Sequence, residues 1–432
     1  MNTILLVMVS AAFVFAGWHQ LVWDPAAGTT APMELLSTAI IEAASGAVTL
    51  AIGLVGVMTL FLGLMKVAEA GGMLRLLARL IRPLMVRLFP DVPADHPALG
   101  AMILNLSANA LGLGNAATPF GIRAMQELDK LNAQPGTATN AMVLFLAINT
   151  SSVTLLPTGV IALRAAAGSS DPAAILPTTL IATIGSTTVA ILAAKLYSRW
   201  TAAPPPVAGS AVSATDKADN GAAPAAAMEE GEPFPLWVSV LALVGLVGLV
   251  PVAVLYGQAL SPWIIPGLMV LFLGFGAMRR VRVYEVMVEG GREGFQVALR
   301  IIPYMVVILV GVAMLRASGV LDLLVGALGR FTAPLGLPAE ALPMALMRPL
   351  SGSGAYAIVA SLLNDPAVGP DSYTGLLVST LQGSTETTFY VLAVYFGAVQ
   401  VKRIRHAMAA ALTADLAGVV CAVLACLVLF GR

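Results

Sequence analysis

Two groups of polar side chains interrupt stretches of sequence that are otherwise apolar enough to enter a membrane. The first group is carried by residues 98–160 and the second by residues 348–388. An unsatisfied polar group is costly in the bilayer interior, so these side chains need partners. We expect them to form a small polar binding site for a solute, with the candidate residues Asn105, Ser107, Asn109, Asn115, Asn149, Thr150, Ser151, Ser152, Arg348, Ser351, Ser353, Gln382, Ser384, Thr385 and Glu386.

Two acidic residues in apolar stretches, Glu386 and Asp415, are candidates for coupling to an ion. A carboxylate at membrane depth is a functional hypothesis by default, because it can exchange a proton, help to bind Na⁺ or recognise an amine or hydroxyl. The alternative for Glu386 is a structural ion pair with Arg348. Arg348 could also hold an anionic group of a solute through its planar guanidinium.

The asparagine-rich segment has an alternative explanation as well. Small and polar residues hold membrane helices together through interhelical hydrogen bonds, and Gly112 and Gly114 would allow a close backbone approach. Four polar residues so close together exceed what packing needs, which favours a solute site. Thr118-Pro119 indicates a helix break that frees backbone carbonyls.

The composition places the chain among membrane proteins. Of its 432 residues, 58% are hydrophobic and only 11% are charged, whereas a soluble domain carries about 25% charged residues. The net charge of zero gives no reason to expect a nucleic-acid partner. Cys421 and Cys426 share one apolar segment and the three histidines are scattered, so we expect neither a metal centre nor a cofactor.

Runs of about 20 apolar residues predict membrane-spanning helices. The clear candidates are 3–23, 46–67, 174–197, 236–257, 261–278, 299–318 and 407–430. Residues 139–163 and 373–398 are long enough but interrupted by polar residues, and residues 98–122 and 341–363 are rich in Gly, Ser and Pro. These four segments predict discontinuous or re-entrant helices within an all-α polytopic membrane fold.

A linker rich in Ala, Pro and Gly divides the chain. Residues 200–235 carry several acidic residues and cannot bury a core, so we expect them to be disordered. On either side we expect a membrane half, residues 1–199 and residues 236–432. The polar clusters and the final apolar spans follow in the same order in both halves, which predicts two pseudo-symmetric units.

The placement of Lys and Arg indicates the orientation of these halves. Residues 399–406 carry Lys402, Arg403 and Arg405, whereas the equivalent loop of the first half, residues 165–173, carries neither Lys nor Arg. The first loop therefore belongs outside and the second inside. Equivalent elements with opposite orientations predict inverted repeats, which is the plan of many secondary transporters.

Two motifs carry a resemblance to known families. The string Asn105-Leu-Ser-Ala-Asn-Ala-Leu-Gly-Leu-Gly-Asn-Ala-Ala-Thr-Pro-Phe-Gly121 resembles spore maturation protein A. Residues 340–400, with Arg-Pro-Leu-Ser-Gly-Ser-Gly and Gly-Ser-Thr-Glu-Thr-Thr-Phe-Tyr390, resemble spore maturation protein B. The chain looks like a fusion of the two, each with a gate or "nucleoside recognition" domain. That domain is similar to segments of concentrative nucleoside transporters and ferrous iron permeases, which implies a transport-like membrane fold.

These observations favour a multi-pass protein of the bacterial inner membrane that transports or channels a small polar solute. The solute would be nucleoside-like or amino-acid-like, with coupling to H⁺ or Na⁺. The alternative is a non-transporting membrane protein that assembles or regulates a partner; a homo-oligomer is left open. An intramembrane enzyme would need a catalytic pair, and with no Walker A, H-E-x-x-H or G-x-S-x-G motif in the sequence we expect no enzyme.

Overall fold

The protein is all-α in the part of the chain that the structure, a computed structural model, describes (residues 2–24, 30–112, 117–201 and 234–431). The helices of the first half are α1 Asn2–Leu21, α2 Pro32–Ala70, α3 Met73–Leu88, α4 Pro97–Ala110, α5 Thr118–Lys130, α6 Asn140–Thr150, α7 Thr158–Ala166 and α8 Leu176–Ser198. Those of the second half are α9 Leu236–Met278, α10 Val283–Ala317, α11 Val320–Thr332, the short 3-10 helices η3 Ala333–Leu335 and η4 Ala339–Ala341, α12 Leu342–Met347, α13 Gly352–Asn364, α14 Tyr373–Ser384, α15 Thr388–Ala398 and α16 Ala407–Phe430.

The four segments expected to be discontinuous are each divided into two helices. Residues 111–117 separate α4 from α5, residues 151–157 separate α6 from α7, residues 348–351 separate α12 from α13, and residues 385–387 separate α14 from α15. Proline helps to place the second of these breaks, because Pro157 lacks an N–H and stands directly before α7. The all-α membrane fold expected from the sequence is confirmed.

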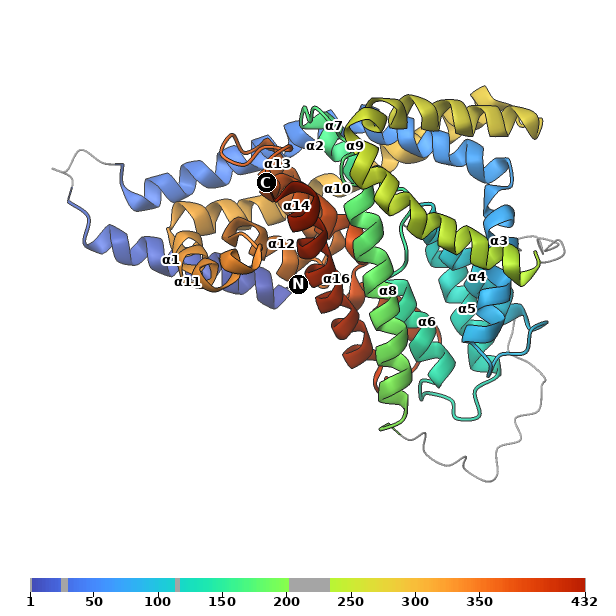
Figure 1. The fold of residues 1–432 in the computed structure, drawn as a ribbon. Coiled ribbons are helices and arrows are strands. Elements are labelled where there is room, and N and C mark those ends of the chain that lie inside the picture. The colour runs from blue at the N-terminus through green and yellow to red at the C-terminus, as the bar shows by residue number, and fades with distance from the viewer. Residues whose placement is uncertain (1, 25–29, 113–116, 202–233, 432) are drawn as a thin grey trace.

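Helices α8 and α16 form the centre of the molecule and run antiparallel (Figure 1). Near the end of α8, the hydroxyl of Tyr197 lies 3.1 Å from the hydroxyl of Thr413, which is near the start of α16. Closer to the start of α8, Gly185 packs against Cys421, which is further along α16. These two helices are the final spans of the two halves. Their opposite directions agree with inverted repeats, although the relation of the complete halves stays a prediction.

Loops of the two halves meet at both ends of this central bundle. At one end the buried guanidinium of Arg164 lies 3.1 Å from the carboxylate of Asp371, which also accepts hydrogen bonds from Ser169 and Ser170. At the other end the amides of residues 402 and 403 donate to the carbonyl of Gly136. Each end of the bundle is therefore held by one loop from each half.

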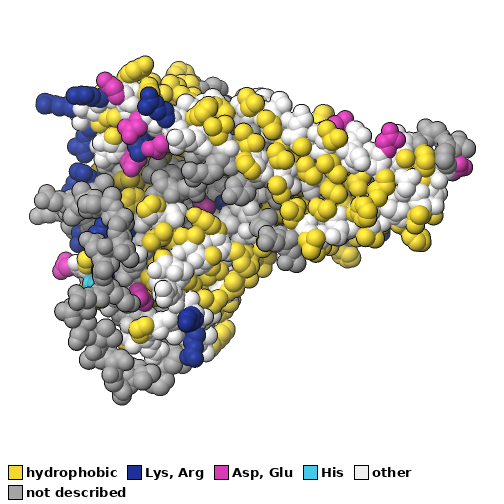
Figure 2. All heavy atoms as spheres, turned by 180° about the vertical axis from the view of Figure 1, so that it is seen from behind, with side chains coloured by type: hydrophobic (Ala, Val, Ile, Leu, Met, Phe, Trp, Pro, Cys, Tyr) yellow, Lys and Arg dark blue, Asp and Glu magenta, His cyan; other side chains and the backbone are white. Residues whose placement is uncertain are grey.

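Helices α2 and α10 pack along each other and carry an arm that also contains α1 and α11 (Figure 1). Figure 2 shows apolar side chains spread over this arm, while Lys and Arg side chains gather at the opposite end of the molecule. On α1, Phe13, Val14 and Trp18 are all more than half exposed. A surface of this kind is suited to lipid.

Helix α9 differs from the two spans expected at 236–257 and 261–278. It continues without interruption over 43 residues and is bent in Figure 1. At 1.5 Å per residue it is about 65 Å long, roughly twice the ~30 Å hydrocarbon core of a bilayer. Within the described residues, α8 and α16 are the two helices whose length and hydropathy both suit a membrane span.

Candidate functional site

The two interrupted helices of the core cross at their breaks. Half-helix α6 ends at Thr150 and half-helix α14 ends at Ser384. The amide N–H of Glu386 donates a 2.7 Å hydrogen bond to the carbonyl of Thr150, so the two breaks touch through their backbones. The last four carbonyls of a helix have no partner within the helix, and the crossing therefore places two sets of such acceptors near each other.

Hydroxyl groups satisfy the carbonyls at the first break. The side chains of Thr150 and Ser151 both donate to the carbonyl of Ala147, one turn earlier in α6. From α8, the hydroxyl of Thr187 donates to the carbonyl of Ser151, and the hydroxyl of Thr183 accepts from the amide of Thr154 at 3.4 Å. These partners at the α6–α7 break are all electrically neutral.

A guanidinium satisfies the carbonyls at the second break. Arg348 donates from Nε to the carbonyl of Gln382 at 3.1 Å and from Nη2 to the carbonyl of Thr385. Its Nη1 donates to the hydroxyl of Thr387 at 3.1 Å. The side chain is only 8% exposed. A cation at a helix C-terminus is stabilised by the helix dipole, so Arg348 both fills the hydrogen bonds and matches the charge at the end of α14.

An acid stands at the start of the following half-helix. The carboxylate Oδ2 of Asp415, on α16, accepts a 2.7 Å hydrogen bond from the hydroxyl of Thr388, the first residue of α15. Asp415 is 5% exposed, and its other oxygen, Oδ1, is buried without a hydrogen-bond partner. An anion near a helix N-terminus has the favourable sign, so Asp415 and Arg348 flank the second break with complementary charges.

Glu386 has a different environment from these two groups. Its side chain is 44% exposed, and its Oε2 lies 3.7 Å from Nη2 of Arg348. The ion pair considered from the sequence is therefore present but long. The hydrogen bonds of Arg348 go to the backbone and to Thr387 instead, which leaves the carboxylate of Glu386 available at the surface of the crossing.

The asparagines expected to form the first cluster do meet. Asn149 donates to Oδ1 of Asn105, and Asn109 donates to Oδ1 of Asn149 at 3.0 Å. Tyr395 from α15 joins them, because its hydroxyl accepts from Asn105 at 3.1 Å and donates to Asn149 at 3.2 Å. Gly121 makes room for this hydroxyl, since a Cβ there would lie 2.1 Å from it. The four side chains form one buried network that links the two halves.

The remaining candidates fall into several groups. Ser152 and Ser384 donate to carbonyls of their own helical turns, at 3.5 and 2.9 Å. Ser351 caps α13 by accepting from the amide of Gly354, and Ser353 lies 3.5 Å from it, both half-buried. Two candidates, Ser107 and Gln382, each have a side-chain oxygen that is buried without a hydrogen-bond partner among the described residues. Asn115 lies outside the described residues.

Several residues of the crossing were not among the candidate site residues, although Thr387 and Thr388 belong to the polar stretch 348–388. Thr387 and Thr388 bind the two charged groups, Thr183 and Thr187 serve the first break, and Tyr395 completes the asparagine network. A tyrosine in an apolar segment that follows a helix break is a usable signal, because a buried hydroxyl needs a partner. The α8 threonines carry no such signal, since hydroxyls on a membrane helix commonly bond to their own backbone.

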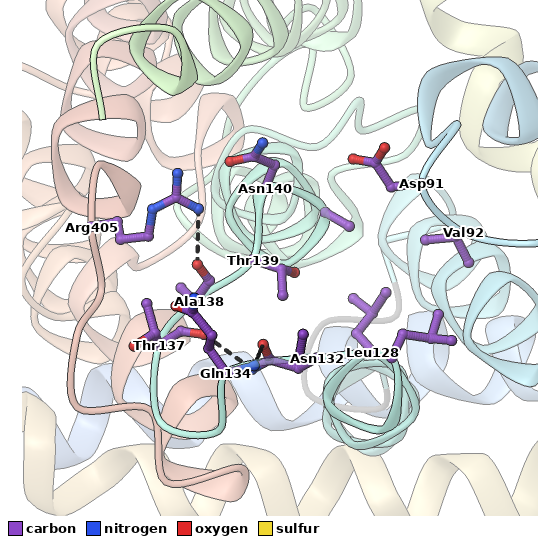
Figure 3. A pocket seen from close by; sticks show the side chains of 13 residues that line it. Asp91, Val92, Leu128, Asn132, Gln134, Thr137, Ala138, Thr139, Asn140 and Arg405 are labelled. Atoms are coloured by element: carbon purple, nitrogen blue, oxygen red, sulfur yellow. Dashed lines mark hydrogen bonds between the residues drawn. The ribbon is translucent and has the colours of Figure 1, made fainter. Parts of the chain in front are cut away.

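A pocket of about 330 Å³ lies away from the crossing, at the start of α6 (Figure 3). Figure 3 shows Arg405 and Asp91 on opposite sides of it, with Asn140 between them in the view. Arg405 donates to the carbonyl of Ala138 at 3.0 Å and so fastens the loop. Asn140 lines the pocket and the break follows Thr150, so ten residues of helix, or about 15 Å, separate the pocket from the crossing. The pocket therefore lies at the loop face, the end of the molecule where the loop before α6 meets Arg405. Its lining consists of Asp91, Val92, Leu128, Leu131, Asn132, Ala133, Gln134, Thr137, Ala138, Thr139, Asn140, Ala141 and Arg405.

Comparisons with known proteins identify the family. The family model described as Gate, nucleoside recognition, matches residues 51–167 and 298–402, which include both crossing breaks. The chain is 45% identical over 165 residues to spore maturation protein A of Bacillus subtilis (strain 168), covering 38% of this chain and 84% of that protein. It is 44% identical over 173 residues to spore maturation protein B of the same organism, covering 40% of this chain and 94% of that protein. No solved structure matches. The chain thus belongs to the Gate family of nucleoside recognition membrane proteins and combines counterparts of spore maturation proteins A and B.

Proposed function

We propose that the protein is a secondary transporter or channel-like permease for a small polar solute. The observation that carries this proposal is the crossing of two interrupted helices, joined by the hydrogen bond from the amide of Glu386 to the carbonyl of Thr150. Irregular backbone is tolerated at membrane depth where it is buried in protein or lines a water-filled path. Broken helices that meet near the midplane are the binding sites of many secondary transporters. The family match supports a membrane transport-related role.

The solute would bind at the accessible edge of the crossing. Glu386 is 44% exposed, and Ser351 and Ser353 are half-buried. Gly352 lies between these serines and faces Thr387, since a Cβ there would lie 2.6 Å from the Thr387 hydroxyl. Two hydroxyls and a carboxylate suit a solute with several hydroxyl or amine groups, which is consistent with a nucleoside-like or amino-acid-like compound. The asparagine network is less suited to this role because its groups already bind one another.

The setting we propose is the bacterial inner membrane, crossed several times by two related halves, with transport coupled to H⁺ or Na⁺. The apolar helices α8 and α16 and the apolar arm in Figure 2 support a membrane location. Two halves that each supply one of the two crossing helices, α6–α7 and α14–α15, would give the site one contribution from each side of the membrane, as in transporters built from repeats.

A second candidate is a membrane protein that assembles or regulates a partner without transporting anything. The observation in its favour is the asparagine network itself, because Asn105, Asn109, Asn149 and Tyr395 satisfy one another and would hold helices together without a solute. In that case the polar residues would serve only as contacts between helices, and the crossing would give no path for a solute.

Flux into proteoliposomes distinguishes the two candidates. The purified full-length protein would be reconstituted and tested with radiolabelled uridine, adenosine and alanine. We expect saturable uptake of at least one compound, which Glu386→Gln abolishes. Glu340→Gln is the matched control, because Glu340 is exposed in η4 and distant in sequence from both breaks. Uptake no greater than in empty liposomes, for a protein that is folded and membrane-inserted, would favour the non-transporting candidate.

A further inference from the structure

We infer that the coupling ion is a proton carried by Asp415, and that Arg348 occupies the place at the end of α14 that Na⁺ would otherwise take. This inference rests on the proposed transport function and makes it more specific. It follows from an account of the backbone carbonyls at the ends of α6 and α14, because a Na⁺ site built from helix ends requires free carbonyls, whereas a proton site requires one titratable group.

Backbone carbonyls at the C-terminal ends of broken helices are the groups that coordinate Na⁺ in many transporters. Here four of the carbonyls at or beside the ends of α6 and α14 already accept a hydrogen bond. At the second break Arg348 binds the carbonyls of Gln382 and Thr385. At the first break the carbonyl of Thr150 accepts from the backbone, and that of Ser151 accepts from a hydroxyl of α8.

Arg348 also supplies the positive charge that a metal ion would supply. Its guanidinium is buried at the end of α14, where a helix C-terminus attracts a cation. A Na⁺ ion entering the same region would meet this fixed positive charge and would find the carbonyls of Gln382 and Thr385 already bound. The arrangement therefore disfavours a second cation beside Arg348.

Asp415 offers the titratable group. One carboxylate oxygen accepts from Thr388, while Oδ1 is buried with no partner in the described structure. A buried acceptor without a hydrogen bond is costly, and a carboxylate that takes up a proton loses its charge and gains a donor. Asp415 thus has a free oxygen, Oδ1, that can take up a proton, and the hydrogen bond from Thr388 to Oδ2 fixes the orientation of the carboxylate.

The surroundings of Asp415 hold few other groups that could carry the proton. The charge of Arg348 acts on it, and Glu386 lies 3.7 Å from that arginine; α15 carries Tyr395, whose hydroxyl belongs to the asparagine network. From α8, Ser186 donates to the carbonyl of Ala414 at 2.9 Å and so adds a neutral hydroxyl. α14 contributes the hydroxyl of Thr380, which lies further along the bundle near Cys426. Helix α6, which also packs against α16, contains no acidic residue.

The hydrogen bonds connect the proton to the helix break. Asp415 binds Thr388, and the adjacent Thr387 accepts from Arg348, which binds the end of α14. Protonation removes the negative charge at the start of α15, where the helix dipole favours an anion. The proton arrives at Oδ1 from water on one side and leaves to water on the other, with no other bond formed or broken. Its gain or loss would change how firmly the two half-helices are held together.

The first test measures the proton without any solute. Infrared difference spectra of the purified full-length protein, recorded across a pH series, should show a protonated buried carboxyl that disappears at high pH. We expect this band to be absent in Asp415→Asn and present in Glu386→Gln. A band that persists in Asp415→Asn, or that Glu386→Gln removes, would overturn the assignment.

A second variant covers the case in which Asp415→Asn does not fold. Thr388→Val keeps the carboxylate but removes the donor to Oδ2. Because that hydrogen bond favours the charged form, its loss should raise the pH midpoint of the carboxyl band by about one unit. A midpoint that does not move would contradict the role given to the Thr388–Asp415 contact.

The choice between ions is tested by thermal unfolding in sodium chloride and in choline chloride. We expect the same unfolding temperature in both salts, because without a Na⁺ site neither salt binds the folded state specifically. An ion that does bind the folded state would raise the unfolding temperature once its concentration exceeds its Kd. A Na⁺-specific rise that Asp415→Asn removes would overturn the inference and leave transport intact. Conversely, an Asp415 titration in a protein with no solute flux would leave the proton site standing and refute the proposed function.

Discussion

Arg348 and Glu386 are separated by 3.7 Å, and the structure assigns them unequal roles in stability. In Arg348→Met the carbonyls of Gln382 and Thr385 and the hydroxyl of Thr387 all lose their donor. A hydrogen bond from a charged group contributes about 1.5–3 kcal/mol, and buried acceptors without partners add a further cost. We expect Arg348→Met to lower the free energy of unfolding by about 3–5 kcal/mol, the range for removing one member of a buried charged group.

Glu386→Gln should cost much less. Its side chain is 44% exposed and its contact with Arg348 is longer than a hydrogen bond. Exposed ion pairs contribute about 0–1 kcal/mol. A double-mutant cycle of the two substitutions should therefore give a coupling energy of no more than about 1 kcal/mol, the upper end for an exposed ion pair.

The assay is equilibrium unfolding of the purified protein in detergent, followed by circular dichroism. Arg348→Lys is the control for charge, because an ammonium keeps the positive charge but cannot form the three bonds of the planar fork. It should fall between the wild-type protein and Arg348→Met. A Glu386→Gln variant as unstable as Arg348→Met, with much of that loss recovered in the double variant, would mean that the two residues form a structural pair and would refute this reasoning.

Three further predictions concern residues around the crossing and at the loop face. Gly112→Ala should destabilise the protein by at least ~2 kcal/mol more than the control Gly168→Ala. Both glycines have positive φ, which costs an L-residue about 1–2 kcal/mol, but only at Gly112 would the Cβ collide, 2.1 Å from the carbonyl oxygen of Leu156; equal losses by chemical denaturation would contradict this packing. Tyr395→Phe should cost about 1 kcal/mol, because Asn105 and Asn149 each keep another hydrogen bond, and a loss above ~3 kcal/mol would mean that the hydroxyl holds the network alone. Burial raises the pKa of Asp371, but hydrogen bonds from Ser169 and Ser170 and the charge of Arg164 outweigh it, so the pKa lies below its usual 3.8. The contribution of ionised Asp371 to the free energy of unfolding is therefore present above pH 3.8 and is lost as the pH falls below that value. Asp371→Asn should flatten the acid limb of a plot of unfolding temperature against pH.

The interruptions of the helices were predictable because each carries a local chemical signal. Pro157 and the hydroxyl-rich residues after Thr150 end α6, and the Ser-Thr-Glu-Thr segment does the same for α14. Polar residues that compete with the helix backbone are visible in the sequence whatever surrounds them. Asn105 and Asn149 were both expected to be candidate site residues, and the structure shows that they bind each other.

The partners of the charged groups depended on distant parts of the chain and could not be predicted. An ion pair with Arg348 was the alternative considered for Glu386, and it is present at 3.7 Å, but the guanidinium donates to the carbonyls of Gln382 and Thr385, which carry no sequence signal. Asp415 and Thr388 are 27 residues apart and meet only because α16 turns back beside α15. Residues 236–278 were expected to form two spans, because each apolar run is about as long as one bilayer crossing. They form one helix, α9, because hydropathy does not report whether a long apolar segment is interrupted.

The central claim, that the crossing is where the solute binds, is tested most directly by labelling a cysteine placed there. Ser353→Cys would be made in a protein whose Cys421 and Cys426 are replaced by Ala, and reacted in sealed vesicles with an impermeant thiol reagent. Ser107→Cys is the buried control, since Ser107 is 0% exposed. We expect Ser353→Cys to react, to be slowed by whichever of uridine, adenosine or alanine is transported, and Ser107→Cys to remain unreactive. Labelling of Ser353→Cys that the transported compound does not slow, or no labelling from either face, would contradict a solute site at the crossing.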